Sequence, residues 1–169
     1  MVKSLFFCLC FISFFSVYSQ NQGEINFHSS FEEENFSASN NYVAQLLMAD
    51  ALVTPAEYST FRGQLDDYAL TLAAKRSKFK TEKDFISHIF YRTHRKFLKR
   101  YSSFTTIANL MRSGRYDCLS ATSLYSQLFT QLNLEHSIIE TNYHIYIKVI
   151  TDNKGEILIE STDPIYGFV

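Results

Sequence analysis

The sequence lacks tryptophan and has only two prolines, five glycines and three cysteines among its 169 residues. Cys8 and Cys10 lie in an apolar run near the N-terminus, so removal of that run as a leader leaves Cys118 as the single thiol. A disulfide framework is thereby excluded. Acidic and basic residues nearly balance, with a formal net charge of −1, and this excludes the strongly basic surface of a nucleic-acid-binding protein.

The first 19 residues have the architecture of a secretory signal peptide (1–19). Lys3 precedes an apolar run over residues 5–15, and the small side chains of Val17 and Ser19 precede Gln20. The apolar run is about half as long as the roughly 20 residues of a membrane-spanning helix. We therefore expect cleavage between Ser19 and Gln20, a periplasmic or secreted mature protein, and no stable membrane insertion after cleavage.

The rest of the chain divides into a lead-in and one domain. Residues 20–37 are polar and acidic without a sustained period, which predicts a flexible segment. Residues 38–169 are long enough for one domain with its own core. Helical periodicity runs over 38–132 and β-rich runs occupy 135–169, so an α+β fold is predicted, with helices first and an antiparallel sheet second.

Three helices are expected in the first half of the domain, two of them with clear start signals. Thr54 and Thr81 are capping residues, each followed three positions later by an acidic side chain, and the first helix follows Ser39 and Asn40. The side chains expected to face the core are Val43, Leu46, Leu47, Ala51, Tyr58, Phe61, Leu65, Tyr68 or Ala69, Leu72, Phe85, Ile89, Phe97 and Tyr101. The third helix also has a basic outer face, expected to be solvated, with Arg92, His94, Arg95, Lys96, Lys99 and Arg100.

Cys118 is predicted to lie at the start of a central, mostly buried helix over 119–132. Ser113-Gly114 ends a short helix immediately before it, and Asp117 is expected to be the N-cap, with its charge spent on backbone N–H groups. The unsatisfied N–H groups of a helix start favour a thiolate over a thiol. The alternative is a free cysteine that is simply a small buried side chain.

Three β-rich runs follow at 137–141, 144–150 and 156–160, the last two joined by a hairpin turn over 151–155. Antiparallel pairing through this turn places His144 opposite residue 162 or 163. We therefore expect a contact between the imidazole of His144 and the carboxylate of Asp163. Taken alone, His144 would more simply be a surface histidine on a half-solvated sheet.

These motifs resemble those of a known family. Tyr-Asp-Cys-Leu-Ser-Ala-Thr-Ser-Leu-Tyr around Cys118, His-Ile-Tyr-Ile-Lys-Val from His144 and Ile-Glu-Ser-Thr-Asp-Pro around Asp163 resemble a bacterial member of the transglutaminase-like superfamily. The resemblance covers about residues 85–169. It implies a papain-like cysteine-peptidase fold, with Cys118 as nucleophile, His144 as base and Asp163 as the carboxylate that orients the base.

The expected function is that of an exported cysteine-dependent amide-bond enzyme, a peptidase, amidase or acyltransferase that works through a thioester. The backbone N–H of Cys118 is one expected oxyanion donor, and Tyr101, Asn109 or Tyr116 could supply the second. Hydroxyl-bearing rings are expected around the site, at Tyr116, Tyr125, Tyr143, Tyr146 and Tyr166. They favour a wet cleft and hydrolysis of a peptide or protein substrate, cell-wall peptide included. No cofactor or metal is expected.

The lack of tryptophan leaves a second interpretation open. True transglutaminases often have an aromatic residue directly after the nucleophile, whereas Leu119 follows Cys118 here. A non-catalytic periplasmic binding or scaffold module with the same fold would also fit the sequence, because a fold by itself does not establish an activity. A thiol packed away from His144 would favour that alternative.

Overall fold

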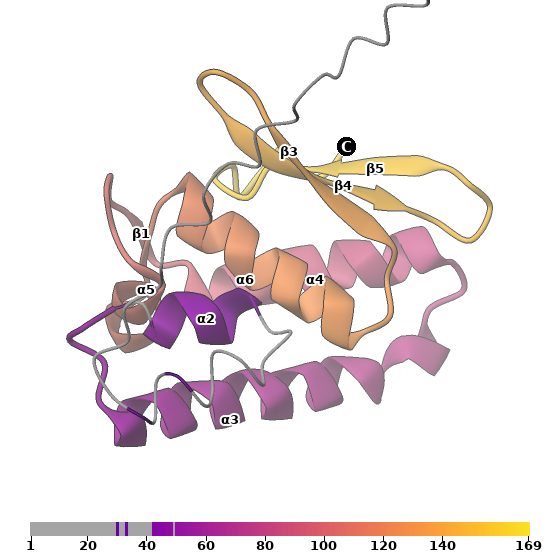
Figure 1. Ribbon diagram of the computed structural model, residues 1–169. Coiled ribbons are helices and arrows are strands. Elements are labelled where there is room, and N and C mark those ends of the chain that lie inside the picture. Colours follow the sequence, from indigo (N-terminus) through magenta and orange to yellow (C-terminus); the bar gives the residue numbers. More distant parts are fainter. Residues whose placement is uncertain (1–29, 31–32, 34–41, 49) are drawn as a thin grey trace, which may run out of the picture.

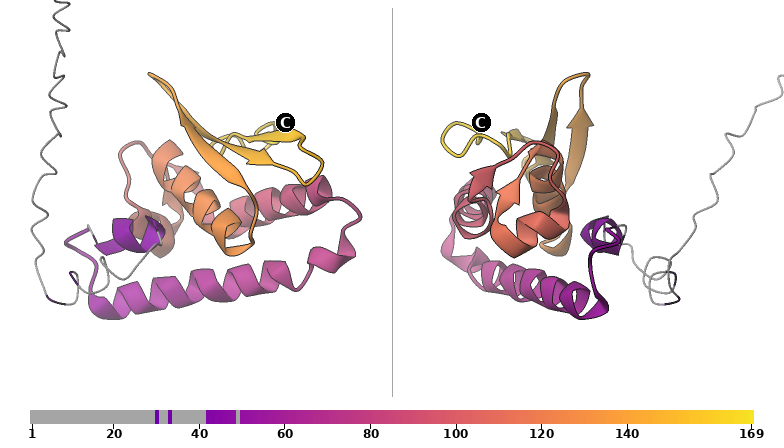
Figure 2. Two further views of the ribbon diagram at one scale, coloured as in Figure 1. Left: turned by 45° about the vertical axis from the view of Figure 1, so that its right-hand side comes forward. Right: turned by 90° about the vertical axis from the view of Figure 1, so that its left-hand side faces the viewer.

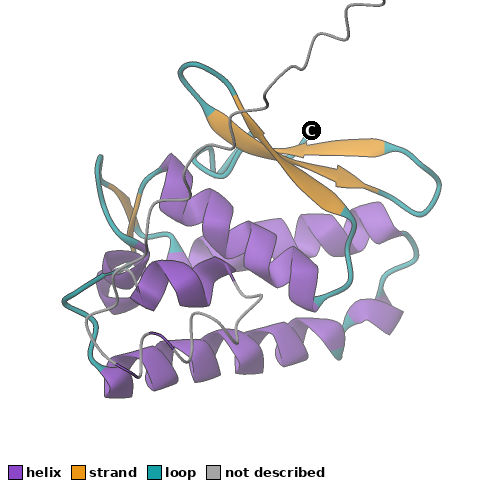
Figure 3. Cartoon of the chain, in the orientation of Figure 1, coloured by secondary structure: helices purple, strands orange, loops and turns teal. Residues whose placement is uncertain are grey.

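The computed structural model describes residues 30, 33, 42–48 and 50–169 and confirms the α+β class, with helices first and sheet last (Figure 1, Figure 3). The sheet is one outer layer, α6 and α4 lie next to it, and α3 is the outer layer on the other side, as two further views also show (Figure 2). The elements are α2 (Tyr42–Met48), α3 (Pro55–Ala73), η1 (Arg76–Lys78), α4 (Glu82–Phe97), β1 (Arg100–Tyr101), α5 (Ile107–Ser113), β2 (Arg115–Tyr116), α6 (Cys118–Gln131), β3 (His136–Glu140), β4 (Ile145–Ile150) and β5 (Glu156–Ile159).

Most predictions for the N-terminal part concern residues outside the described ranges. The signal peptide (1–19) and the Ser39-Asn40 cap lie outside the described residues, as does the lead-in (20–37) apart from Ser30 and Glu33, which are helical. In the described part of the chain, no helix has both the length and the apolar character needed to cross a bilayer.

Helix α3 begins where its capping sequence predicts. The Thr54 side chain accepts a hydrogen bond from the Glu57 N–H, and the Glu57 carboxylate accepts one from the Thr54 N–H, which completes a capping box. Arg112 of α5 donates to the same carboxylate at 2.9 Å, and this hydrogen bond is the main cause that lowers the pKa of Glu57 to about 2. The predicted inner face is confirmed by the buried side chains Tyr58, Phe61, Leu65, Tyr68, Ala69 and Leu72.

Helix α4 also has its predicted cap, since the Thr81 side chain accepts from the Asp84 N–H. Its predicted exposed face is wrong at one position: His94 is only 6% exposed. The imidazole packs edge-on against the rings of Phe90 and Tyr116, so it belongs to the core and not to the basic surface. The neighbouring basic residue Arg95 is exposed as predicted.

Conversely, two positions that were expected in the core are exposed. The first helix stops at Met48, and Ala51 lies in an exposed turn where the Asp50 carboxylate accepts from the Leu52 N–H. Tyr101 is 52% exposed because α4 ends at Phe97 and the chain has entered β1 by that point.

The segment before α6 is shaped by Gly114. Gly114 ends α5 in the left-handed conformation, with φ 74°, and a Cβ there would collide with the Lys99 side chain and the Phe97 carbonyl. The chain continues directly into β2, which pairs in parallel with β1. This pairing, which the sequence did not predict, holds Tyr116 in place immediately before the N-cap of α6.

The three-stranded sheet has the order β3-β4-β5 and is antiparallel throughout. Ile147 pairs with Ile159 and Ile150 with Glu156, so the turn lies at 151–155 as predicted. The buried side of the sheet carries Ile147, Val149, Ile157 and Ile159, and β3 and β4 contact α6. Helix α6 is consequently enclosed between the sheet and α3.

Candidate active site

Cys118 is the first residue of α6, and Asp117 is its N-cap as predicted. The Asp117 Oδ1 atom accepts from the Ser120 N–H at 2.8 Å and from the Ser120 hydroxyl at 2.7 Å. Its Oδ2 atom accepts from the Thr105 N–H at 3.1 Å. The carboxylate next to the thiol is therefore engaged on both oxygens, which reduces its opposition to a thiolate.

The thiol itself is partly exposed and forms no disulfide. As the first residue of a helix of 14 residues, Cys118 has a backbone N–H without an intrahelical acceptor. That N–H and the positive end of the helix dipole are suited to stabilise negative charge on the sulfur or on a nearby oxyanion.

His144 immediately precedes β4 and is paired with Glu160, which follows β5. The Nε2 atom of His144 is hydrogen bonded to Oε2 of Glu160, while Oε1 of Glu160 accepts from the N–H and the hydroxyl of Thr162, at 3.0 and 2.6 Å. The carboxylate is thus held on both oxygens. Because Nε2 faces Glu160, Nδ1 of His144 is the ring nitrogen left to exchange a proton with another group.

This pairing differs from the one expected. The carboxylate of Asp163 accepts from the backbone N–H groups of Ile165 and Tyr166, both at 2.9 Å, and these hydrogen bonds lower its pKa. The expected contact of His144 with Asp163 is corrected accordingly, with Glu160 in its place. The physical reason is that Asp163 and Pro164 start a tight turn whose backbone donors lie closer to the carboxylate than the imidazole does.

A buried hydrogen-bond network joins α4, α6 and the turn after β5. The Ser161 hydroxyl and the Thr122 hydroxyl are 3.0 Å apart, and the Ser161 carbonyl lies 2.9 Å from Nε2 of His94. All three side chains are buried, and burial is the main cause that lowers the pKa of His94. Neutral His94 can then donate from Nε2 to the carbonyl, which fixes the residue next to Glu160.

The network indicates which face of α6 lies toward the turn after β5. Cys118 and Thr122 are four residues apart on α6 and so share a face of the helix. Because Thr122 bonds Ser161, that face of α6 lies beside the turn that carries Glu160, the partner of His144. Between the described side chains of Cys118 and His144 there is no hydrogen bond in this state, and in uncomplexed enzymes such contacts are often longer than in the substrate complex.

The candidate oxyanion donors and tyrosines occupy different environments. Tyr101 and Tyr116 stack edge to face just before Asp117, and burial raises the pKa of Tyr116. Tyr125 was expected in a wet cleft, but it is buried in the core and donates its hydroxyl hydrogen to the Phe90 carbonyl. Tyr143 and Tyr166 are exposed, as Tyr101 is, and Tyr146 is half-buried with its ring stacked near His144. Asn109 is exposed on α5.

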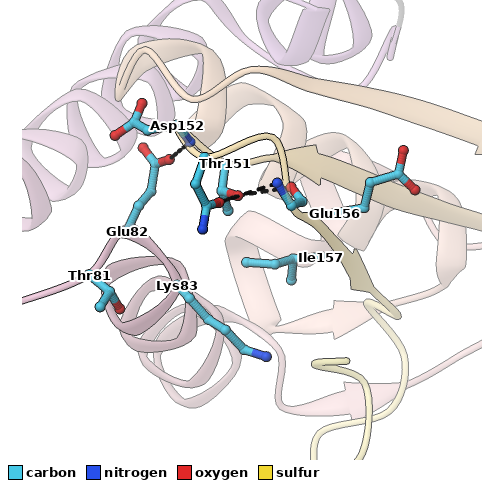
Figure 4. A pocket seen from close by; sticks show the side chains of 9 residues that line it. Thr81, Glu82, Lys83, Thr151, Asp152, Glu156 and Ile157 are labelled. Carbon is cyan, nitrogen blue, oxygen red and sulfur yellow. Dashed lines mark hydrogen bonds between the residues drawn. The ribbon is translucent and has the colours of Figure 1, made fainter.

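A pocket of about 380 Å³ lies elsewhere, between the start of α4 and the β4–β5 turn (Figure 4). Its Glu82 carboxylate accepts from the Asp152 N–H and from Arg76, both at 2.7 Å, and Thr151 is bonded to Gly155 at 2.9 Å. Several polar groups of this pocket are thus hydrogen bonded within the protein, and its described lining residues include neither cysteine nor histidine. Within the described ranges, no three His, Cys, Asp or Glu side chains are grouped as metal ligands.

No protein-family model, curated protein or solved structure matches this chain.

The site residues that sequence reasoning missed are Glu160, Ser161, Thr122 and His94. One signal for Glu160 was present in the strand alternation. If the Ile147–Ile159 register is continued, His144 falls opposite Thr162, and Glu160 lies on the same face of the sheet as its diagonal neighbour. Asp163 has the opposite parity.

Proposed function

We propose that this chain is an exported cysteine-dependent amide-bond hydrolase of transglutaminase-like or papain-like type, with Cys118 as nucleophile, His144 as base and Glu160 as the orienting carboxylate. The observation that supports the proposal is the His144–Glu160 pair, whose neighbouring residue Ser161 is bonded to Thr122, four residues after Cys118 on α6. Glu160 takes the role expected of Asp163. The position outside the cytoplasm rests on the signal-peptide pattern of residues 1–19.

In the proposed reaction, Nδ1 of His144 takes the proton of the Cys118 thiol, and the sulfur attacks the carbonyl carbon of an amide. The Cys118 N–H donates to the oxyanion that forms. The C–N bond then breaks, the amine leaves with the proton from His144, and a thioester remains on Cys118. Water, deprotonated by His144, attacks the thioester and releases the carboxylic acid and the thiol.

Alkylation of Cys118 by iodoacetamide across pH tests the assignment without a known substrate. A thiolate stabilised by His144 should react at pH values well below the usual thiol pKa of about 8.5, and His144→Ala should abolish this reaction at low pH. His136→Ala is the matched control, because His136 is a half-buried histidine bonded to Ser126. An ordinary thiol profile that is identical in the wild type and His144→Ala would contradict the proposal and favour the non-catalytic module.

Hydrolysis can be distinguished from transamidation by trapping. The protein is incubated with a pool of glutamine-containing and other peptides and a labelled primary amine near 1 mM, on the order of common substrate concentrations. Release of free acid is expected. If the labelled amine receives the acyl group in preference to water, the proposed reaction becomes acyl transfer to amines instead of hydrolysis. The role of Cys118 as nucleophile would be unchanged.

A further inference from the structure

A second pocket of about 380 Å³ opens directly beside the first turn of α6. Its walls include Leu46 and Ala51 from the region of α2, Ile107 at the start of α5, and Leu119 and Ser120 of α6. Figure 1 shows α2 and α5 close to α6, and both helices contact it. The pocket therefore begins at the residue that follows Cys118 in the chain.

The wall opposite α6 is tied to the N-cap of the cysteine helix. Thr105, which lines the pocket, donates its N–H to Oδ2 of Asp117 at 3.1 Å. The distance between the pocket wall and the helix start is thus set by a hydrogen bond to the residue that precedes Cys118. A group bound in this pocket would contact Leu119, the residue that follows the proposed nucleophile in the chain.

Several of the polar groups that line the pocket are already hydrogen bonded within the protein. The Ser120 hydroxyl belongs to the Asp117 capping box, and the Thr106 hydroxyl accepts from a backbone N–H in the first turn of α5. Oδ1 of Asp50 accepts from the Leu52 N–H. An occupant would therefore find few unpaired polar partners and would bind mainly through apolar contact.

Part of the apolar lining is exposed, whereas Ile107 is buried. Leu119 is 48% exposed although it belongs to the central helix of the protein, and Leu46 is only partly buried. A carboxylate, that of Asp50, stands on the same lining and disfavours an acidic occupant. An uncharged apolar group of side-chain size is the occupant that covers this surface at no electrostatic cost.

We propose that the pocket binds an apolar side chain of the peptide whose carbonyl Cys118 attacks. The proposal rests on the proposed function and gives it a substrate class, namely peptides with an aliphatic or aromatic side chain next to the cleaved bond. Leu119 is then a specificity-determining residue. It stands directly after the proposed nucleophile, where true transglutaminases often have an aromatic side chain.

The test compares the alkylation of Cys118 in the full chain by iodoacetamide and by N-hexyl iodoacetamide. Each second-order rate is measured by intact-mass spectrometry and divided by the rate of the same reagent with N-acetylcysteine. The hexyl reagent should react at least about tenfold faster after this correction, because several methylene groups leave water. Leu119→Asp should abolish the preference, and so should Ala51→Phe, which fills the pocket from an exposed turn. Leu158→Asp, at a residue of β5 with 41% exposure, is the control and should keep it.

The outcomes separate the two proposals. A corrected rate ratio near one in the wild type, with a rate that still depends on His144, overturns the apolar subsite and leaves the proposed hydrolase intact. A ratio that is unchanged in both Leu119→Asp and Ala51→Phe also overturns the subsite. A rate independent of His144 overturns the proposed function and the subsite that rests on it. Should Leu119→Asp fail to fold by circular dichroism, Ala51→Phe alone decides.

Discussion

Nε2 of His144 is hydrogen bonded to Oε2 of Glu160 across the β4–β5 side of the sheet. The carboxylate is fixed on its other oxygen by Thr162, so the imidazole has one defined orientation and one nitrogen available for proton transfer. Because Ser161 ties the same turn to Thr122 of α6, this pair and the Cys118 helix are parts of one packed unit.

The two carboxylates after β5 are expected to differ in their effect on the thiol. Glu160→Gln removes the negative partner of His144, so the alkylation rate of Cys118 at neutral pH should fall by about tenfold or more. Asp163→Asn should change the rate by no more than about twofold, because an amide oxygen can still accept from the Ile165 and Tyr166 N–H groups. The same iodoacetamide assay measures both. The reverse ranking would return the orienting role to Asp163.

Gly167 is expected to be essential to the position of Glu160. The Gly167 carbonyl accepts from the Glu160 N–H at 2.7 Å, and a Cβ on Gly167 would collide with the Glu160 and Asp163 carbonyl oxygens. Gly167→Ala should destabilise the protein by about 1–3 kcal/mol and slow alkylation. Gly63→Ala is the control: nothing lies within 4 Å of a Cβ there, so helix α3 should gain about 0.5–1 kcal/mol. Urea unfolding measures the change in the free energy of unfolding of each variant relative to the wild type. Changes of the same sign in the two variants would contradict this prediction.

Burial of His94 predicts a pH dependence of stability. Its lowered pKa means that the unfolded chain binds a proton more readily, so stability should be complete above the unfolded pKa of about 6.5 and fall as pH decreases below it. His94→Gln, which can still donate to the Ser161 carbonyl, should flatten this fall. His88 contributes in the same direction, because burial lowers its pKa as well. Urea unfolding at pH 7 and pH 5 measures the effect.

The Glu57–Arg112 pair predicts a second, more acidic dependence. The pKa of Glu57 is lowered from 4.5 to about 2, so its contribution to stability is present above pH 4.5 and is lost as pH falls toward 2. Glu57→Gln should therefore lower stability at pH 7 and remove part of the loss between pH 4.5 and 2. Thermal unfolding of both proteins over this range measures it. Parallel curves for the two proteins would contradict the assignment.

The fold features that were predicted correctly depend mostly on local sequence signals, namely helix caps and a hairpin turn. Thr54, Thr81 and Asp117 were identified as caps because capping depends on side chains within three residues of the helix start. The register of β4 and β5 followed from the position of their turn. His94 was misplaced because its burial depends on Ser161, which is 67 residues away in the chain.

The choice between Glu160 and Asp163 shows where such reasoning stops. The predicted register placed His144 opposite residue 162 or 163 and so favoured Asp163. In the structure the Asp163 carboxylate accepts from the N–H groups of Ile165 and Tyr166, and Glu160 bonds His144. The Asp-Pro pair was a turn signal, and together with strand parity it would have favoured Glu160. The network through Thr122 and Ser161 carried no signal of its own, because buried serine and threonine pairs have no characteristic spacing.

Under the proposed function, the buried network between His94, Thr122 and Ser161 would make the reactivity of the Cys118 thiol a reporter of complete folding. The network residues come from three segments far apart in the chain, namely α4, α6 and the turn after β5. A partly folded state in which the turn after β5 has not made these contacts would not orient His144. Loosening of that turn alone would slow labelling of the thiol while the helices stay intact. The ratio of labelling rate to helical signal during denaturation would therefore resolve opening of the site from global unfolding.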